Sequence, residues 1–469
     1  MAKVGGHRID KKSYNEKECD KMNLKYITTT YENNQCKTIE KNLSMKADTG
    51  IEKEVINLYP QMKAQTFEGF GGAFTDSAGY IYSLMNEEQK KTMIERYFGA
   101  GENDLRYRLG RLHIDSCDFS LEHYEAMSNA DDIDMESFTL ERTEKYMLPF
   151  LRDVQSYLGK EVELMITPWS PPAFMKSNKE RNHGGTLLDE YKQFWAKYMC
   201  RYIKELKAVG CNITCLSLQN EPKAVQTWDS CIYTIAEERE FLKDFFYPEL
   251  VKNGFDDIDI YIWDHNKERL FERACGIIDD ETNHMVAGVA FHWYGGDHFE
   301  AIHLVRELFP DKKLVMSEAC IEYSLADSDN HLLNAQKYAH DIIGDLNGGM
   351  TAFYDWNLVL DQEGGPNHVK NYCDAPYMYD IKEKVLKEQN TLKYLWHFSH
   401  FIDVGAKKIG FSRYTDDIEV TALENPDGTL VMVAMNQNKE EKTIVLRVCD
   451  EEAIFVIPGE SITTGVVTK

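Results

Sequence analysis

The sequence predicts an α/β fold, a (β/α)8 (TIM) barrel with a side antiparallel β-sandwich domain built from both chain termini. Three observations carry this prediction. Eight short apolar runs alternate with longer amphipathic, charge-rich stretches between about Gln65 and Trp356. Polar and aromatic residues stand at or just after the C-terminal ends of those runs, the face on which such barrels carry an active site. The tail then changes to short alternating runs separated by turn residues.

The barrel prediction rests on the order of its elements. We expect strands at 66–71, 105–114, 163–169, 214–221, 258–264, 286–294, 313–318 and 350–356. Helical patterns lie between them, such as 237–250, and 189–207 with Tyr191, Phe194, Trp195, Tyr198 and Ile203 on one side. We therefore assign residues 56–394 to the barrel.

The two ends of the chain predict the second domain. Near the C-terminus, alternating runs at 418–424, 430–436 and 442–448 are separated by Asn-Pro-Asp-Gly at 425–428 and by a polar segment at 437–440. The N-terminal segments 25–31 and 36–43 also have strand-like patterns. We therefore expect residues 1–55 and 395–469 to form one β-sandwich beside the barrel.

Composition limits the partners and the compartment. The chain has 469 residues, 43% of them hydrophobic, and a net charge of −25 spread along its length, which disfavours nucleic acid and anionic membranes. The 11 cysteines are scattered, with no CxxC pair and no metal-ligand spacing, which fits reduced thiols in the cytoplasm. No apolar run approaches the ~18 residues of a membrane span, and the N-terminus lacks the apolar segment of a leader. Nothing indicates an oligomeric state.

Two glutamates end strand-like runs and suggest a chemistry. Glu221 closes Leu-Ser-Leu-Gln-Asn-Glu before Pro222, and Glu318 closes Leu-Val-Met-Ser-Glu. A pair of carboxyl groups is what cleavage of a glycosidic bond requires, because one protonates the leaving oxygen and the other attacks the anomeric carbon or activates water. The barrel order brings both strand ends to one face. We interpret the two residues as a catalytic pair.

The ordered motifs around these glutamates resemble glycoside hydrolase family 30, most closely its acid β-glucosidase (glucosylceramidase-like) branch. They span roughly 300 residues and are Gly69-Phe-Gly-Gly-Ala-Phe-Thr-Asp76, Arg111, Ser116-Cys-Asp-Phe-Ser120, Pro168-Trp-Ser-Pro171, Gln219-Asn-Glu-Pro222, His292-Trp-Tyr294, Ser317-Glu-Ala-Cys320, Asp355-Trp-Asn357 and Glu363-Gly-Gly-Pro-Asn367. Asn-Glu-Pro alone is weak evidence, whereas the full ordered set is specific.

The resemblance implies a role for each matching residue. Glu221 would be the general acid/base, Glu318 the nucleophile, and Asn220 the residue that bonds the sugar 2-hydroxyl. The remaining matches would be sugar contacts on the pocket floor (Asp76, Trp169, Trp356 and Asn371), walls of the pocket (Trp228, Trp293 and Tyr294), and residues that orient the two carboxylates (Arg111 and His292).

Several of these residues have simpler explanations. Asp76 stands where the first barrel helix should begin, a position at which Asp often caps a helix. Arg111 could be an ordinary ion-pair partner, and His292 a hydrogen-bonded core histidine. The strand-end aromatics could be core residues.

The function that we predict is that of a retaining exo-β-glycosidase, β-glucosidase or glucosylceramidase-like, which acts on a small β-glycoside or oligosaccharide without cofactor or metal. The rim departs from the resembled branch at His113, Asp115 and His368, which leaves β-xylosidase, β-fucosidase and β-1,6-glucanase activities open.

Two further alternatives come from other classes. One is a metal-dependent barrel hydrolase with the ligands His113, Asp115, Asp264, His265 and His292, which lack a recognisable ligand spacing. The other is a non-catalytic carbohydrate-binding barrel, which would not need both glutamates.

Overall fold

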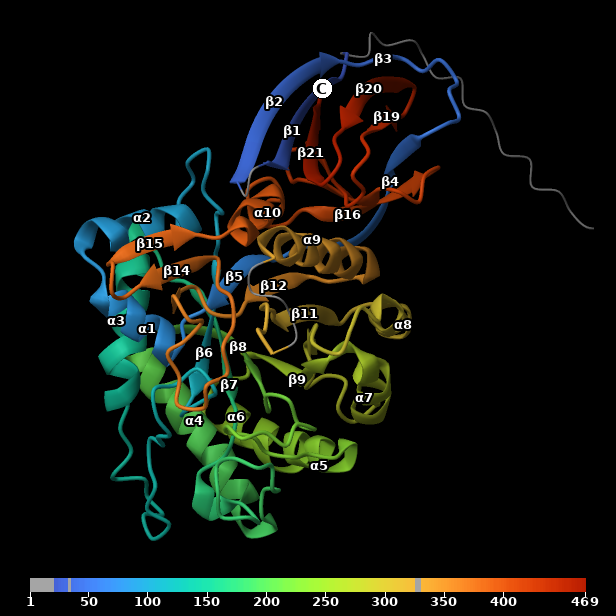
Figure 1. Ribbon diagram of the computed structural model, residues 1–469. Helices are drawn as coiled ribbons and strands as arrows, with labels where there is room; N and C mark the ends of the chain where they lie inside the picture. Colours follow the sequence, from blue (N-terminus) through green and yellow to red (C-terminus); the bar gives the residue numbers. More distant parts are fainter. Residues whose placement is uncertain (1–20, 33–34, 325–329) are drawn as a thin grey trace, which may run out of the picture.

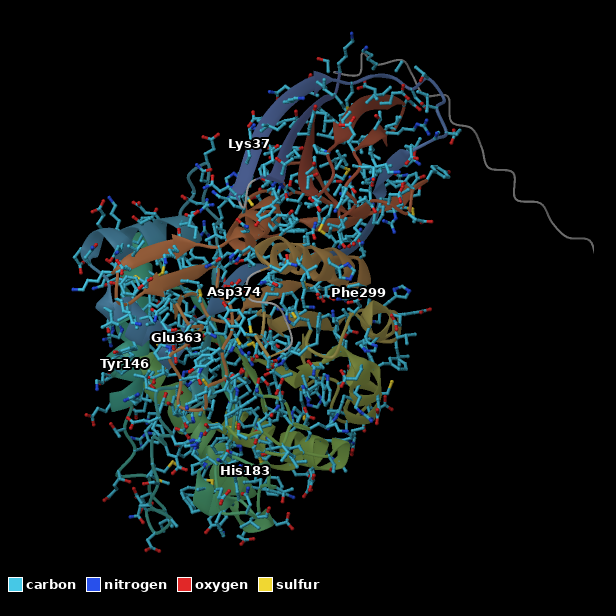
Figure 2. All side chains as sticks on the ribbon, in the orientation of Figure 1. Lys37, Tyr146, His183, Phe299, Glu363 and Asp374 are labelled. Atoms are coloured by element: carbon cyan, nitrogen blue, oxygen red, sulfur yellow. The ribbon has the colours of Figure 1, made fainter. Side chains whose placement is uncertain are left out.

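A computed structural model shows a closed barrel packed beside a β-sandwich (Figure 1). It describes residues 21–32, 35–324 and 330–469. Figure 2 locates Lys37 on the sandwich and Tyr146, His183 and Phe299 on the barrel. The N-terminal segment in which no leader was expected, and Cys19, lie outside the described residues. No described helix is long and apolar enough to cross a membrane.

The barrel has eight parallel strands, as predicted. They are β5 (Gly69–Ala73), β6 (Leu109–Ile114), β7 (Glu163–Pro168), β8 (Asn212–Ser217), β9 (Asp259–Asn266), β10 (Gly288–His292), β11 (Lys313–Glu318) and β12 (Ala352–Asp355). Pairing of β12 with β5 closes the ring. Gly71 allows the close approach of β5 to β6, because a Cβ there would lie 2.1 Å from the Leu109 carbonyl oxygen. The fold-class prediction is confirmed.

Helices surround this ring and cover its outer face. They are α1 (Asp76–Leu84), α2 (Glu87–Phe98), α3 (Glu141–Leu158), α4 (Lys192–Ala208), α5 (Ile235–Glu240), the π-helical turn η3 (Phe241–Phe246), α6 (Tyr247–Lys252), α7 (Leu270–Ile277), α8 (Phe299–Leu308), α9 (His331–Gly348) and α10 (Asn390–Ser399). A three-stranded sheet follows the last barrel strand and comprises β13 (Leu360–Asp361), β14 (Tyr377–Asp380) and β15 (Val385–Glu388).

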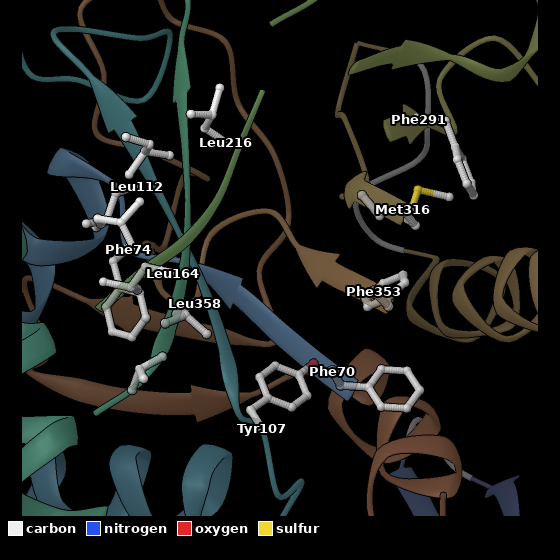
Figure 3. Packing of buried hydrophobic residues seen from close by; sticks show 14 of the residues in the cluster. Phe70, Phe74, Tyr107, Leu112, Leu164, Leu216, Phe291, Met316, Phe353 and Leu358 are labelled. Atoms are coloured by element: carbon white, nitrogen blue, oxygen red, sulfur yellow. The ribbon is translucent and has the colours of Figure 1, made fainter. Parts of the chain in front are cut away.

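Alternation along the strands divides the barrel core into two layers. Leu112, Leu164 and Leu216 belong to the large cluster between strands and helices (Figure 3). A separate cluster comes from seven of the strands and fills the barrel interior below the C-terminal end of the ring. It consists of Leu109, Met165, Cys215, Tyr261, Ala290, Val315, Ala352 and Tyr354. This packed plug leaves the C-terminal end of the ring for polar side chains.

The sandwich strands come from both ends of the chain. They are β1 (Asn23–Glu32), β2 (Gln35–Ser44), β3 (Lys46–Ala47), β4 (Val55–Thr66), β16 (Lys407–Arg413), β17 (Glu419–Glu424), β18 (Leu430–Asn436), β19 (Lys442–Val448), β20 (Glu451–Ile457) and β21 (Ser461–Thr468). β1 pairs with β21 from Asn23–Thr468 to Thr30–Ser461.

Two details of the sandwich differ from the prediction. The β4–β19 pair is parallel, so the sheet is not wholly antiparallel. The expected domain boundary at residues 55/56 falls at the start of β4, which continues in the sandwich sheet to Thr66 because Thr66 still pairs with Lys407. The first barrel strand therefore begins at Gly69 rather than at residue 66.

Helix α10 joins the two parts through a buried histidine. It packs on α9 and β21, and the expected boundary at residue 395 lies inside it. The ring nitrogens of His397 lie 2.7 Å from Thr29 Oγ1 and 2.8 Å from Thr464 Oγ1. Burial without an anionic partner lowers the pKa of His397 to about 3, with His400 adding to the shift. The residue is therefore neutral in the folded protein.

A pH-dependent loss of stability follows from His397. Its contribution is complete above its unfolded pKa of about 6.5 and is lost as the pH falls toward 3, by up to about 1.4 kcal/mol per pH unit. We expect the His397→Gln variant, which keeps hydrogen-bonding capacity but does not titrate, to lose less stability than the parent between about pH 6 and 4. Urea-unfolding midpoints across this range measure the difference, and parallel slopes would contradict the assignment.

Candidate active site

Glu221 lies in a tight turn beyond β8. The strand ends at Ser217, four residues earlier than predicted, and Glu221 adopts a left-handed backbone conformation with φ +47°. Two backbone hydrogen bonds fix this turn, from Asn220 N to the Pro168 carbonyl (2.8 Å) and from Glu221 N to the Asp264 carbonyl (2.9 Å). Neighbouring barrel strands thus hold a conformation that is unfavourable for a residue with a side chain.

Glu318 is the last residue of β11 and is almost fully buried. Its two oxygens accept separate hydrogen bonds, Oε2 from Arg111 Nη1 (2.7 Å) and Oε1 from the Tyr294 hydroxyl (3.0 Å). These bonds fix the orientation of the carboxylate at the end of the barrel strand.

Arg111 connects the groups around the two glutamates. Its Nη2 donates to Asn220 Oδ1 (3.1 Å) and to Asp264 Oδ2 (3.0 Å), in addition to the Glu318 bond. The guanidinium lies 4.9 Å from the ring centre of Trp169 and 5.5 Å from that of Trp356. Its side chain is completely buried, so the carboxylates and the aromatic faces replace the water around the charge.

His292 contacts both glutamates and Asp264. Its Nδ1 lies 3.2 Å from Glu221 Oε1, and its Nε2 lies 3.1 Å from Asp264 Oδ1 and 4.0 Å from Glu318 Oε2. Because both nitrogens face carboxylates, the ring acts as a double donor. Burial opposes the charge, but the surrounding carboxylates raise the pKa of His292 to about 10. His292 is therefore a buried imidazolium.

Their surroundings shift the pKa values of the two glutamates in opposite directions. Burial raises the pKa of Glu221, yet His265 and His292 outweigh this effect and hold that pKa below its usual range. Burial also raises the pKa of Glu318, and there His292 and Arg111 only partly offset it. Two cations, Arg111 and His292, face three carboxyl groups at Glu221, Glu318 and Asp264.

A cavity of about 200 Å³ opens above this network. It is lined by both glutamates together with Asp118, Trp169, Asn220, Gln226, Trp228, His265, Asn266, Tyr294, Cys320, Glu322, Trp356, Asn371 and Cys373. Six of the predicted sugar contacts are therefore on its wall, namely Trp169, Asn220, Trp228, Tyr294, Trp356 and Asn371. Trp169 and Trp356 are stacked with ring centres 5.3 Å apart.

Two predicted contacts lie elsewhere. Asp76 is buried beside the pocket rather than in its wall, because Arg142 forms an ion pair with its carboxylate (2.9 Å) and Leu121 N donates to the same oxygen. It is the first residue of α1, whose N-cap is Thr75. Trp293 faces the core, where it packs on Tyr338 and donates to the Cys320 carbonyl.

Asp118 is the main pocket residue that the sequence reasoning missed. Its Oδ2 accepts from Asn371 Nδ2 (3.2 Å), and its buried Oδ1 has no partner in the described structure. Burial raises its pKa, and the charges of Glu318 and Glu221 add to the shift. Asp118 lies within the Ser116–Ser120 motif just after β6. Its place after a barrel strand is the sequence feature that indicates a pocket residue. His265, whose Nδ1 lies 3.5 Å from Glu221 Oε1, follows the fifth predicted strand and also lines the pocket.

The expected ligands of a metal-dependent hydrolase do not form one cluster. His113 accepts from Asp76 N and contacts the Asp115 carbonyl, and the Asp115 carboxylate accepts from Tyr198. Asp264, His265 and His292 instead surround Glu221.

A larger cavity of about 680 Å³ lies at the opposite end of the barrel, where Lys313 pairs with Glu68 and Asp259.

Comparisons with known proteins match both parts of the chain. The Glycosyl hydrolase family 30 TIM-barrel domain matches residues 67–402, and the family 30 beta sandwich domain matches 405–465. The lysosomal acid glucosylceramidase of Mus musculus is 30% identical over 89% of this chain and 84% of its own. The crystal structure of SrfJ from Salmonella typhimurium has a TM-score of 0.90 at 35% identity, covering 94% of this chain and 99% of SrfJ. The endo-beta1,6-glucanase BT3312 has a TM-score of 0.83 at 25% identity over 95% and 100%.

Asp76 and Asp118 give a matched test of the pocket. We expect Asp76→Asn to lower the free energy of unfolding by about 1–3 kcal/mol, since Arg142 loses its buried anionic partner and keeps only the exposed Glu122. The variant should leave kcat/KM on an aryl β-glycoside within about twofold. Asp118→Asn should lower kcat/KM by roughly 10- to 100-fold with little change in stability. Thermal unfolding and steady-state kinetics on both variants measure the contrast. The reverse pattern would place Asp76, not Asp118, in the substrate site.

Proposed function

The chain belongs to glycosyl hydrolase family 30 and is a glycoside hydrolase, and on that premise we propose that it hydrolyses β-glucosides as an exo-acting enzyme with retention of configuration. The observation that carries the proposal is the linkage of the two strand-end glutamates through one imidazolium, His292, at the base of one cavity. A metal is not needed for this mechanism, because two carboxyl groups supply both the nucleophile and the proton transfer.

Glu318 is the nucleophile in this proposal. One of its oxygens attacks the anomeric carbon, and the bond from that carbon to the leaving oxygen breaks, which gives a glycosyl-enzyme. Arg111 and Tyr294 hold the carboxylate by hydrogen bonds to separate oxygens, and this fixes its direction of attack. The positive charges of Arg111 and His292 favour the ionised form that the attack requires.

Glu221 is the acid/base in this proposal, and its proton comes from His292 beside it. The His292 imidazolium carries this proton at rest, with its Nδ1 3.2 Å from Glu221 Oε1. Transfer through Glu221 to the leaving oxygen completes the first step. In the second step, ionised Glu221 removes a proton from water, whose oxygen attacks the anomeric carbon and releases Glu318. This proton then passes from Glu221 to His292 and restores the imidazolium.

The pocket favours a single terminal sugar. Its volume of about 200 Å³ is below the ~300 Å³ at which drug-sized ligand sites begin, which suits one pyranose ring. Trp228 and Tyr294 offer apolar surface for the sugar faces, and Asp118, Asn220 and Asn371 offer polar groups for its hydroxyls. Similarity to the mouse glucosylceramidase favours glucose in this position.

An endo-β-1,6-glucanase is the second candidate. It is supported by the likeness to BT3312, which extends over almost the whole of both chains. A small pocket that takes one sugar opposes it, because an internal cleavage needs subsites on both sides of the scissile bond. The two candidates differ in the product that they release from a long glucan.

The glutamate roles predict two different products with azide. We expect Glu318→Gln to be inactive, because an amide cannot form the glycosyl-enzyme, and added azide to enter from the vacated side and give the α-glycosyl azide. Glu221→Gln should still react with activated aryl glycosides and then stall, and azide should restore turnover as the β-glycosyl azide. Proton NMR distinguishes the anomers. The same anomer from both folded variants would refute the assignment.

A substrate panel separates the candidate specificities. We expect the aryl β-glucoside to be cleaved faster than the xyloside, fucoside and galactoside, and a β-1,6-linked glucan to release glucose from its end. Proton NMR should show the β-anomer first. Short glucan oligomers as the first products would favour the endo-glucanase, and preference for another glycoside would replace glucose.

A further inference from the structure

Three side chains from separate barrel loops meet at the pocket rim. His123 lies between β6 and α3, Asp229 between β8 and α5, and His368 between β13 and β14. One nitrogen or oxygen of each lies within 4.8 Å of those of the other two. Asp229 Oδ2 is 3.2 Å from His123 Nδ1 and 4.0 Å from His368 Nε2. None of the three lines the sugar cavity.

Two buried acceptors face each other in this cluster. His368 Nδ1 lies 2.8 Å from the Ser120 carbonyl, which can only accept, so Nδ1 carries the proton. In the neutral ring Nε2 therefore presents a lone pair to Asp229 Oδ2. His368 Nε2 has no hydrogen-bond partner among the described residues, and Asp229 Oδ2, on a completely buried side chain, faces only the ring nitrogens of His123 and His368 there. Two lone pairs pointing at a shared space form a site for a cation or for a donor such as water.

Hydrogen bonds on the outer side of the cluster hold its side chains in place. The other oxygen of Asp229 accepts from Arg181 Nε and from Ser116 Oγ (2.9 Å), which orients the carboxylate. Hydrogen bonds of this kind on the outer atoms are typical of metal ligands.

We propose that His123, Asp229 and His368 form a binding site for a divalent transition metal, with Zn²⁺ the best fit. Two imidazoles and one carboxylate are a ligand set that suits Zn²⁺, and a fourth position remains for water. Ligand atoms on a tetrahedral Zn²⁺ lie about 3.4 Å apart, so side-chain shifts of roughly 1 Å complete the site. The exposed edge of His123 gives the metal a route in.

The metal would stabilise the sugar pocket without taking part in the reaction. Each of the three loops also carries a residue of the cavity wall, Asp118 before His123, Trp228 next to Asp229, and Asn371 after His368. One ion bound to all three loops restrains their relative movement. Bound metal should therefore raise the thermal stability of the protein and lower KM more than it changes kcat.

Metal binding is tested directly on the full chain. We expect protein treated with a chelator and then dialysed to bind one equivalent of Zn²⁺ by titration calorimetry, with a rise of several degrees in its unfolding midpoint. Co²⁺ should give the strong visible absorption of a four-coordinate site. His368→Asn keeps a donor for the Ser120 carbonyl but has no Nε2, and His123→Phe keeps the ring contact with His368 but has no nitrogen.

Both variants should bind Zn²⁺ at least ~100-fold more weakly, whereas His183→Ala should bind like the parent. His183, labelled in Figure 2, is a matched control, because it is an exposed histidine that also faces a carboxylate, Glu180 at 3.0 Å, but has no third ligand in the part of the chain that the structure describes. Equal binding by the parent and both ligand variants, or no saturable binding by the parent, would overturn the proposal and leave a bridging water as the explanation of the two facing acceptors.

Discussion

The buried guanidinium of Arg111 is the interaction on which the catalytic end of the barrel depends. It starts from β6 and reaches groups on or just after β8, β9 and β11, so one side chain joins strands on different sides of the ring. A buried cation is tolerated only where several acceptors replace water. Conversely, Glu318 and Asp264 are buried anions that require such a cation. Removal of any member would leave the others without compensation, so the group behaves as one unit.

Local backbone strain places several of these groups. Glu221, Asp264, Asp115 and Asn357 all have left-handed backbone conformations just after or near the end of a barrel strand. A side chain makes this conformation unfavourable, and the closed sheet beneath supplies the rigidity that maintains it. At each of these positions the polypeptide turns sharply where the strand ends. For Glu221 and Asp264 this brings the carboxylates to Arg111 and His292, whereas the Asp115 carboxylate accepts from Tyr198 on α4.

The sequence predicted the barrel and the strand-end glutamates because both depend on local order. Apolar runs mark strands, and their C-terminal ends share one face. It did not show that Asp118 rather than Asp76 lines the pocket, because both residues follow a barrel strand. Only the three-dimensional packing reveals that Asp76 forms an ion pair with Arg142. The same limit applies to Trp293, whose direction is set by Tyr338 on a distant helix. β4 continues in the sandwich to Thr66 because it pairs with β16, some 340 residues away. A local sequence pattern does not reveal such a distant pairing.

The pairing of β1 with β21 has a consequence for synthesis on the ribosome. Thr28 contacts Thr463 across 435 residues of chain, so the N-terminal strands emerge long before the strand that covers them. At about 5–20 residues per second, β1 and β2 wait for roughly 20 to 90 s. During this interval the hairpin presents an unpaired edge to other nascent chains, and an edge of this kind is prone to aggregation. β2 is mostly exposed and carries Lys37, Glu40 and Lys41, and these charges oppose such association while the remainder of the enzyme is being made.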